Sequence, residues 1–284
     1  MNKSELTSNQ LGELFEFSKN YSVPDWKFQE CHLKQYKDIP KEIKPYYLSS
    51  LKITLQTDGY LLFDFSKLLE NKLECEIASF ITFFINLFGN QIKIFDKLNS
   101  VWRKIGVDLN KDPNKSEGIG ESPLHMDFVN SEFPPEIVCL FVIRPDSYGG
   151  ESTLSRISGI EKDLIPSVIA TLKKNIFQDG KVEGLSNIGK DINPFPIISI
   201  NDKWQYRFTA NLLKSNDGLA KDALIELYNL LLDKQVSYKV EKNNLLLINQ
   251  HVMLHGKKPL GPNQELINLQ NNRLLMHGFI NTIK

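Results

Sequence analysis

The segment SPLHMDF at 122–128 places a histidine and an aspartate two positions apart. Residues i and i+2 of an extended strand project from the same face, so His125 and Asp127 can reach one point together. An imidazole nitrogen and a carboxylate oxygen are two of the three protein ligands of the facial triad, which binds Fe(II) and leaves three coordination positions open. The tripeptide alone is also compatible with a histidine that hydrogen-bonds to a neighbouring aspartate where a strand begins.

Two histidines in the run NNLLLINQHVMLHG at 243–256 are candidates for a third ligand. The apolar stretch 243–254 predicts a buried strand, and His251 and His255 can both lie on one face of it. Spacing therefore does not choose between them. Gly256 follows His255 and would open the backbone where a site needs access. A core histidine without a ligand role is the alternative for each.

Arginine is scarce in this chain, because 29 of its 34 basic residues are lysines. A guanidinium is planar and permanently charged, so it suits bidentate binding of a carboxylate better than an ammonium does. Arg273 lies in NRLLMHGFI at 272–280, a segment that predicts a final core strand. It is therefore a candidate anion-binding residue, and a surface ion pair is the alternative.

The composition excludes several classes of function. Acidic and basic residues balance at 34 each, which gives no basic surplus for nucleic acid or for an anionic membrane. The longest apolar stretch, at 77–88, is too short to span a bilayer, and the polar start MNKSELTSNQ does not resemble a signal peptide. Three dispersed cysteines predict no disulfide framework. A cytoplasmic protein with a small-molecule partner is expected, and the sequence does not indicate an oligomeric state.

The pattern of apolar and turn residues predicts one α+β domain over residues 1–284. Residues 1–50 are expected to form a wrapping segment, and 51–284 a double-stranded β-helix (jelly-roll) core flanked by helices. The stretch 51–65 is compatible with a hairpin at Asp58-Gly59, or with a helix that ends there and a strand from Tyr60. Helices are expected at 67–88, 159–174 and 216–234, and strands at 136–145, 195–210 (a pair around Asn201-Asp202), 243–254 and 272–280.

Four segments together resemble the taurine dioxygenase / clavaminate synthase-like family of Fe(II)/2-oxoglutarate-dependent oxygenases. In chain order they are PLHMDF, PPEIVCLFVIRPDSYGGESTLSRISGI, NNLLLINQHVMLHGKKPL and NRLLMHGF. The match is in order and spacing as well as in letters. It extends over residues 50–284, while the first fifty residues carry no part of it.

The resemblance implies roles for the matching positions. His125 and Asp127 match the HxD pair, and His255 matches the distal histidine in preference to His251. Arg273 stands where the family keeps the arginine that binds the distal carboxylate of 2-oxoglutarate. Its spacing from His255 is similar to that of the clavaminate synthase branch.

A hydroxyl in GGEST at 149–153 matches a family threonine that also contacts 2-oxoglutarate. Ser152 is the direct match and Thr153 is the neighbouring alternative. The chain departs here from the commoner Gly-Gly-Asp/Glu-Thr-Leu form, so both hydroxyls remain candidates.

The implied activity is a hydroxylation in which O2 and 2-oxoglutarate are consumed and succinate and CO2 are released. An intact Asp127 argues against halogenation, because halogenating relatives replace this carboxylate with a small residue. The clavaminate synthase-like spacing suggests a small amino-acid-like substrate. Sulfonates, betaines, carrier-bound acyl groups and desaturation remain alternatives within the class, and a jelly-roll binding protein without turnover is the alternative outside it.

Four residues are candidates for substrate binding at the mouth of the predicted barrel. Phe128 and Asn130 follow the predicted metal ligands, and Glu121 lies in the loop that precedes them. Glu121 could bind an ammonium group, and Arg207 could bind a substrate carboxylate. Each also has an ordinary structural alternative, as a core aromatic, a solvated loop residue or an outward strand residue.

Overall fold

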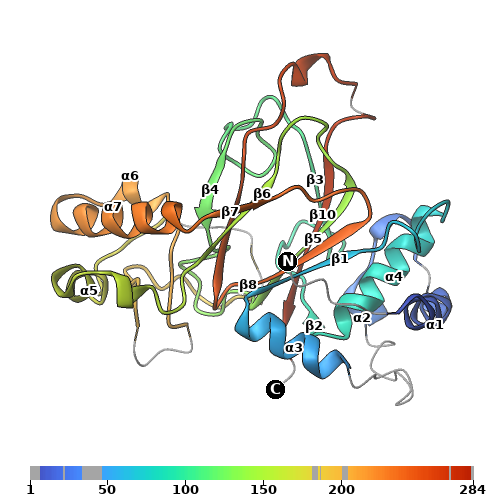
Figure 1. The fold of residues 1–284 in the computed structure, drawn as a ribbon, viewed down its shortest axis with the longest axis horizontal. Coiled ribbons are helices and arrows are strands. Elements are labelled where there is room, and N and C mark those ends of the chain that lie inside the picture. The colour runs from blue at the N-terminus through green and yellow to red at the C-terminus, as the bar shows by residue number, and fades with distance from the viewer. Residues whose placement is uncertain are drawn as a thin grey trace.

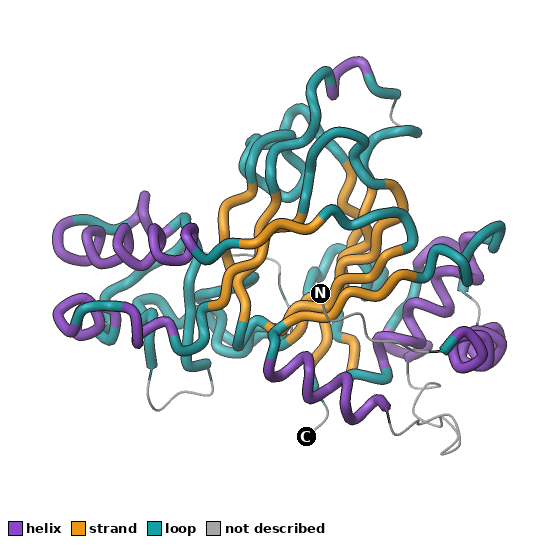
Figure 2. The backbone as a smooth tube through the Cα atoms, in the orientation of Figure 1, coloured by secondary structure: helices purple, strands orange, loops and turns teal. Residues whose placement is uncertain are grey.

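Two antiparallel sheets form the centre of the structure, which is a computed structural model (Figures 1 and 2). It describes residues 7–21, 23–33, 47–180, 185, 187–199, 204–268 and 270–282. The larger sheet has the order β1-β8-β5-β10-β2, with β3 also paired to β10. Its strands are β1 (Tyr60–Asp64), β2 (Asn90–Gln91), β3 (Arg103–Gly106), β5 (Ile137–Arg144), β8 (Asn244–Asn249) and β10 (Leu274–Asn281). The smaller sheet has the order β4-β9-β6-β7 and consists of β4 (Ser122–His125), β6 (Ser152–Arg156), β7 (Val236–Tyr238) and β9 (Met253–Lys257).

The two sheets pack against each other through apolar side chains. One buried cluster joins Val138 and Phe279 of the larger sheet to Leu154 and Met253 of the smaller one. Alternate residues of a strand point to opposite faces, so each sheet directs one set of side chains into this interior and another set toward the helices. Any site between the sheets is therefore built from both of them.

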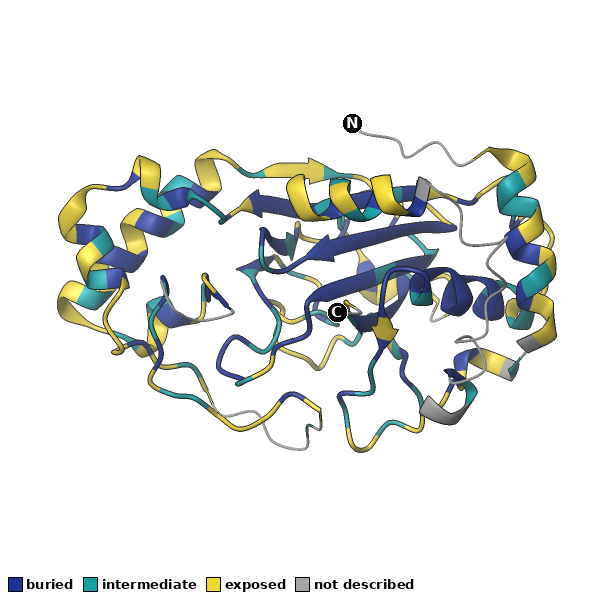
Figure 3. Cartoon of the chain, turned by 90° about the horizontal axis from the view of Figure 1, so that it is seen from below, coloured by how far each residue is buried: buried dark blue, intermediate teal, exposed yellow. Residues whose placement is uncertain are grey.

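Helices cover the outer faces of the sheets at opposite ends of the molecule (Figures 1 and 3). Phe80 and Phe84 of α4 pack with Phe63 and Leu247 of the larger sheet. Near this sheet lie α1 (Ser8–Ser18), α2 (Glu30–Leu33), α3 (Tyr47–Thr57) and α4 (Glu74–Asn86), with the 3-10 turns η1 (Lys19–Tyr21) and η2 (Pro24–Trp26). The other end carries η5 (Ile160–Asp163), α5 (Pro166–Leu172), α6 (Leu212–Ser215) and α7 (Gly218–Asp233), and η6 (Gln264–Leu266) precedes β10.

Several predicted elements are confirmed, with shifts at their boundaries that have local causes. Of the two alternatives for 51–65, the structure has the helix followed by the strand, with Gly59 at φ +86° between them. The helix expected from residue 67 begins only at Glu74, since Asn71 adopts a left-handed conformation that interrupts a helix. The helix expected at 159–174 is divided before Pro166, because the residue that precedes a proline avoids helical angles.

The prediction of one strand over 243–254 is wrong. The chain leaves β8 at Asn249, turns through Gln250–Val252, and enters β9 of the other sheet at Met253. The corner consists of the polar residues Asn249, Gln250 and His251 followed by Val252, and apolar strand residues flank it on both sides, so hydrophobic periodicity alone does not show that the flanking strands belong to different sheets. This corner separates His251 from His255.

The expected strand pair within 195–210 is reduced to an isolated bridge between Ile198 and Tyr206. Its predicted turn at Asn201-Asp202 lies outside the described residues. Among the residues that are described, no helix is long and apolar enough to cross a membrane.

Candidate active site

Three side chains converge between the sheets. One nitrogen each of His125 and His255 and one oxygen of Asp127 all lie within 4.8 Å of one another. Nε2 of His125 is 3.7 Å from Oδ1 of Asp127, and Nε2 of His255 is 3.5 Å from Oδ2. His125 and His255 are cross-strand partners on β4 and β9, which brings their rings to 4.4 Å. The structure thus brings together the three residues predicted as metal ligands.

His125 is oriented by its own strand. Its Nδ1 lies 2.8 Å from the carbonyl oxygen of Pro123, which favours the proton on Nδ1 and leaves the Nε2 lone pair for the site. Burial lowers the pKa of His125 to about 4, and the nearby His255 adds to this effect. The ring is therefore neutral near pH 7, as a metal ligand must be.

Asp127 lies just beyond β4 rather than inside an extended strand, contrary to the expectation for the HxD segment. Its backbone N–H donates to Oε1 of the fully buried Gln250 at 2.5 Å, and the amide of Gln250 donates to the Pro135 carbonyl. The next residue, Phe128, has φ +58°. A bulky side chain rarely adopts this angle, and such strain is common at functional sites. The turn and the Gln250 contact aim the carboxylate back toward His125.

The residue types of the triad, and a buried polar atom that lacks a hydrogen-bond partner among the described residues, are typical of a metal site. Burial by itself would raise the pKa of Asp127, but the imidazoles of His255 and His277, each with Nε2 at 3.5 Å from Oδ2, hold it well below its usual value. Oδ2 of Asp127 is buried without a hydrogen-bond partner among the described residues. Two ligands at about 2.1 Å from one ion and at right angles lie about 3 Å apart, so small side-chain movements would close this site on an ion. The residues present fit Fe(II) or a similar divalent ion.

His251 lies elsewhere. Its ring stacks on Trp204 at 3.8 Å, with an angle of 13° between the planes, and its backbone N–H donates to the side chain of Asn249. The choice between His251 and His255, which spacing left open, thus follows from the corner between β8 and β9.

Gly256 lines the cavity at the triad, where the sequence predicted that the backbone would open, and it also has a packing role. A Cβ at this position would lie 2.5 Å from the Ser122 carbonyl oxygen and 2.7 Å from Oγ1 of Thr153. The glycine therefore permits the close approach of β4 and β6 on either side of β9.

A cavity of about 440 Å³ connects the triad to Arg273. Arg273 precedes β10 directly, is 9% exposed, and makes no hydrogen bond to another residue in the described part of the chain. Burial lowers its pKa to about 10, so the guanidinium stays charged near pH 7. A buried cation that faces a cavity is costly unless an anion binds it. Ser152 and Leu275 also line this cavity.

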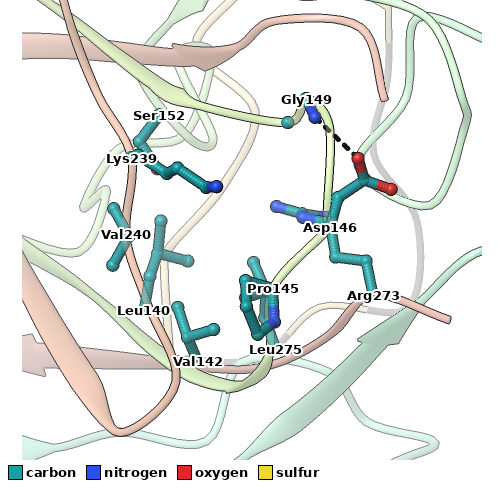
Figure 4. A pocket seen from close by; sticks show the side chains of 11 residues that line it. Leu140, Val142, Pro145, Asp146, Gly149, Ser152, Lys239, Val240, Arg273 and Leu275 are labelled. Carbon is teal, nitrogen blue, oxygen red and sulfur yellow. Dashed lines mark hydrogen bonds between the residues drawn. The ribbon is translucent and has the colours of Figure 1, made fainter. Parts of the chain in front are cut away.

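The cavity continues past Arg273 into a space of about 370 Å³ (Figure 4). Asp146 lies beside Arg273, and its carboxylate accepts hydrogen bonds from the backbone N–H groups of Tyr148, Gly149 and Gly261. These bonds hold the two loops behind Arg273 together. Lys239 extends into the space from the opposite side.

The strand geometry distinguishes the two candidate hydroxyls. Ser152 lines both cavities that touch Arg273, whereas the buried Thr153 lies opposite Gly256 on the other face of β6. Adjacent strand residues point to opposite faces, so only one of the two can face Arg273.

We expect Ser152→Ala to weaken 2-oxoglutarate binding and Thr153→Val to leave it unchanged. One neutral hydrogen bond contributes about 0.5–1.5 kcal/mol, which corresponds to an approximately 2- to 13-fold increase in the dissociation constant. Isothermal titration calorimetry of both variants, loaded with Mn(II) in place of iron, measures this. A weaker binding in Thr153→Val alone would assign the contact to Thr153.

The four predicted substrate residues do not gather at the triad. Arg207 is 2% exposed, and its Nη1 donates to the carbonyls of Val129 and Ser131, so it braces the chain after Asp127. None of the remaining three is among the described residues that line the cavity between the triad and Arg273: Phe128 packs on Phe95 and Phe279, the Asn130 amide donates to the Gly180 carbonyl, and Glu121 is exposed.

Several residues around the site were missed in the sequence. Lys257 is buried two residues after His255, and its Nζ donates to the carbonyls of Gly118 and Gly120. Burial, with the charge of Arg273, lowers the pKa of Lys257 to about 8. The i, i+2 rule could have placed it beside His255. Gln250 and His277 carried no signal, because their positions depend on the corner and on the pairing of β10.

Comparison with known proteins adds evidence at the level of the fold. No protein-family model matches the sequence, and no significant match occurs among curated proteins. Among solved structures, an asparagine oxygenase in complex with Fe(II), 2S,3S-3-hydroxyasparagine and succinate superposes with a TM-score of 0.75 at 15% identity, over 97% of this chain and 92% of that one. The non-heme iron oxygenase OrfP in complex with Fe and alpha-ketoglutaric acid superposes with a TM-score of 0.73 at 12% identity, over 98% and 93%. The chain shares the fold of these oxygenases.

Proposed function

We propose that this protein is an Fe(II)/2-oxoglutarate-dependent oxygenase that hydroxylates a small amino-acid-like metabolite and releases succinate and CO2. One observation carries the proposal: a single cavity is lined by a histidine–aspartate–histidine triad and by the buried guanidinium of Arg273, which has no hydrogen-bond or salt-bridge partner among the described residues. A metal-binding triad alone would serve many enzymes. Its combination with a buried cation fits a cosubstrate that chelates the metal at one end and carries a carboxylate at the other.

Each residue has a defined task in this proposal. His125, Asp127 and His255 hold the ion on one face, which leaves coordination positions for 2-oxoglutarate and O2. Arg273 binds the distal carboxylate of 2-oxoglutarate through its two-pronged guanidinium, with Ser152 as a second donor. When bound, Fe(II) supplies the O2 activation that is coupled to decarboxylation of the cosubstrate. The substrate must then be positioned by side chains beside the ion.

The fold supports the proposal. The asparagine oxygenase was crystallised with a hydroxylated amino acid and succinate, and OrfP was crystallised with Fe, succinate and (3S)-hydroxy-L-Arg. The two facing antiparallel sheets are consistent with the jelly-roll core expected from the sequence. Sequence identities of 12–15% do not indicate which substrate this chain binds, so the substrate is inferred from the residues that line its own cavities.

A second cavity, of about 560 Å³, is also lined by His125 and Asp127 and is the proposed substrate site. Hydrogen-bonding side chains dominate its described lining, including Asn114, Ser116, Thr209 and Asn211. Apart from the triad, Lys115 is the one charged residue among the described residues that line it. Such a lining suits a small polar acid with a neutral or acidic side chain, whose carboxylate Lys115 would attract.

The proposal is tested with an amino-acid panel. The protein is loaded anaerobically with Fe(II), 2-oxoglutarate and one candidate at a time, then exposed to 18O2, and the products are analysed by mass spectrometry. We expect one acid with a neutral or acidic side chain to gain a single labelled oxygen atom, with one succinate per turnover. If only sulfonates or carrier-bound acyl groups were turned over, the proposed amino-acid-like substrate would be wrong and the enzyme class would stand. An absence of succinate formation under all conditions would overturn the enzyme class.

A further inference from the structure

A third histidine, which is buried, faces the triad from the opposite sheet. His277 lies in the middle of β10, where it pairs in register with Leu140 of β5 and with Arg103 of β3, and it is 5% exposed. It lines the same cavity as the triad and Arg273. The triad comes from β4, β9 and the turn after β4, so His277 is a contribution of the larger sheet to a site built mainly on the smaller one.

Its nearest polar neighbour in the site is the carboxylate of Asp127. Nε2 of His277 is 3.5 Å from Oδ2 of Asp127, the oxygen that is buried without a close hydrogen-bond partner among the described residues. Both ring nitrogens of His277 are also buried without a partner there. Burying such polar atoms unpaired costs about 1–3 kcal/mol each, so a short contact between them would remove two penalties at once.

The other histidines cannot provide this contact in a metal-loaded site. Nε2 of His255 lies at the same distance of 3.5 Å from Oδ2, and Nε2 of His125 lies 3.7 Å from Oδ1. A nitrogen that donates its lone pair to a metal carries no proton, so it cannot donate a hydrogen bond to the carboxylate. His277 is then the histidine that still has an N–H for Asp127.

The position of His277 argues against a fourth metal ligand. The atoms of His125, Asp127 and His255 lie within 4.8 Å of one another, and His277 does not belong to this group. Its ring is held by contact with the ring of Phe279 at a centroid distance of 4.3 Å, and Phe279 in turn packs on Phe128 beside Asp127. This packing fixes His277 behind the carboxylate rather than among the ligands.

We propose that His277 is a positioning residue that donates its Nε2–H to Oδ2 of Asp127 and so leaves Oδ1 to bind the ion. This inference rests on the proposed metal site and deepens it. A carboxylate whose second oxygen is held in this way binds an ion through one oxygen in a fixed orientation.

The test compares three substitutions at this position by their Fe(II) affinity. His277→Leu removes the donor, His277→Gln retains an amide N–H2 near the place of Nε2, and His277→Asn reaches only as far as Nδ1. Loss of an outer-shell partner typically costs 10–100-fold in metal affinity, so we expect an increase of about that size in the Fe(II) dissociation constant for Leu and Asn. Gln is expected to restore the affinity to within a few-fold of the wild-type value. His251→Leu is the matched control and should bind Fe(II) like the wild-type protein.

Anaerobic titration calorimetry gives the affinities, and the visible spectrum of the Co(II)-loaded protein reports changes in coordination. Thermal unfolding of the metal-free variants separates a local effect from a folding defect. Unchanged Fe(II) affinity in His277→Leu, or equal losses in the Gln and Leu variants, would overturn the inference. A wild-type protein that binds no Fe(II) would instead overturn the proposed function. A raised substrate KM with unchanged metal affinity would assign His277 to the substrate.

Discussion

Replacement of His255 by alanine is expected to abolish Fe(II) binding under conditions in which the wild-type protein is saturated. His255 is one of the three side chains proposed as ligands, and its cross-strand partner His125 cannot supply a second nitrogen, because its Nδ1 is bound to the Pro123 carbonyl. The loss in affinity should exceed the roughly 100-fold that marks the loss of an outer-shell partner. Anaerobic calorimetry with Fe(II) measures it, and succinate formation should fall in parallel.

The matched control is His251→Ala. His251 lies four positions earlier and stacks on Trp204, so its loss should reduce thermal stability without changing Fe(II) affinity. This pair of variants separates the two histidines that spacing could not. If His251→Ala weakened metal binding as much as His255→Ala, the assignment of the third ligand to His255 would be abandoned.

Substitution of Arg273 by lysine is expected to weaken 2-oxoglutarate binding while the metal site remains intact. Lysine retains the positive charge but offers no planar pair of donors, and a charge-assisted bidentate contact contributes about 1.5–3 kcal/mol. The dissociation constant of 2-oxoglutarate should therefore rise by roughly 10- to 150-fold. Arg273→Ala should have a larger effect, because it also removes the buried charge opposite the cosubstrate carboxylate.

Arg156→Lys is the control for this experiment. Arg156 is exposed at the end of β6, and its guanidinium donates to the backbone carbonyl of Thr57, away from the cavity. It should bind 2-oxoglutarate like the wild-type protein. Calorimetry of the Mn(II)-loaded variants tests both substitutions, and an unchanged affinity in Arg273→Ala would mean that another residue, with Lys257 as the first candidate, binds the carboxylate.

The types of the candidate ligands were predictable from local sequence. His125 and Asp127 are two residues apart in the sequence, and this short separation limits the distance between their Cα atoms in any backbone conformation. Helical periodicity correctly predicted α7, and the apolar run ended by Pro145 correctly predicted β5. These two predictions are correct because helical periodicity and an apolar run that ends at a proline depend only on residues close together in the sequence.

The three-dimensional arrangement decided what the sequence left open. His251 and His255 are four residues apart in one segment that was predicted as a single strand, yet the chain passes from one sheet to the other between them. Ser152 rather than Thr153 faces Arg273 because of the register between β6 and β9. Arg207, which was predicted to bind substrate, is buried, and its Nη1 donates to the backbone carbonyls of Val129 and Ser131.

Local sequence thus determined which residues could bind a metal and an anion, and tertiary structure determined which of them meet. His277 illustrates the division, because it is more than a hundred residues from Asp127 in the sequence and only 3.5 Å from it in space. Such a contact depends on the pairing of β10 with β5 and on the packing of two sheets, and each is set by many weak apolar interactions distributed along the chain. The hydrophobic periodicity of one segment does not indicate with which strand or sheet that segment will pack.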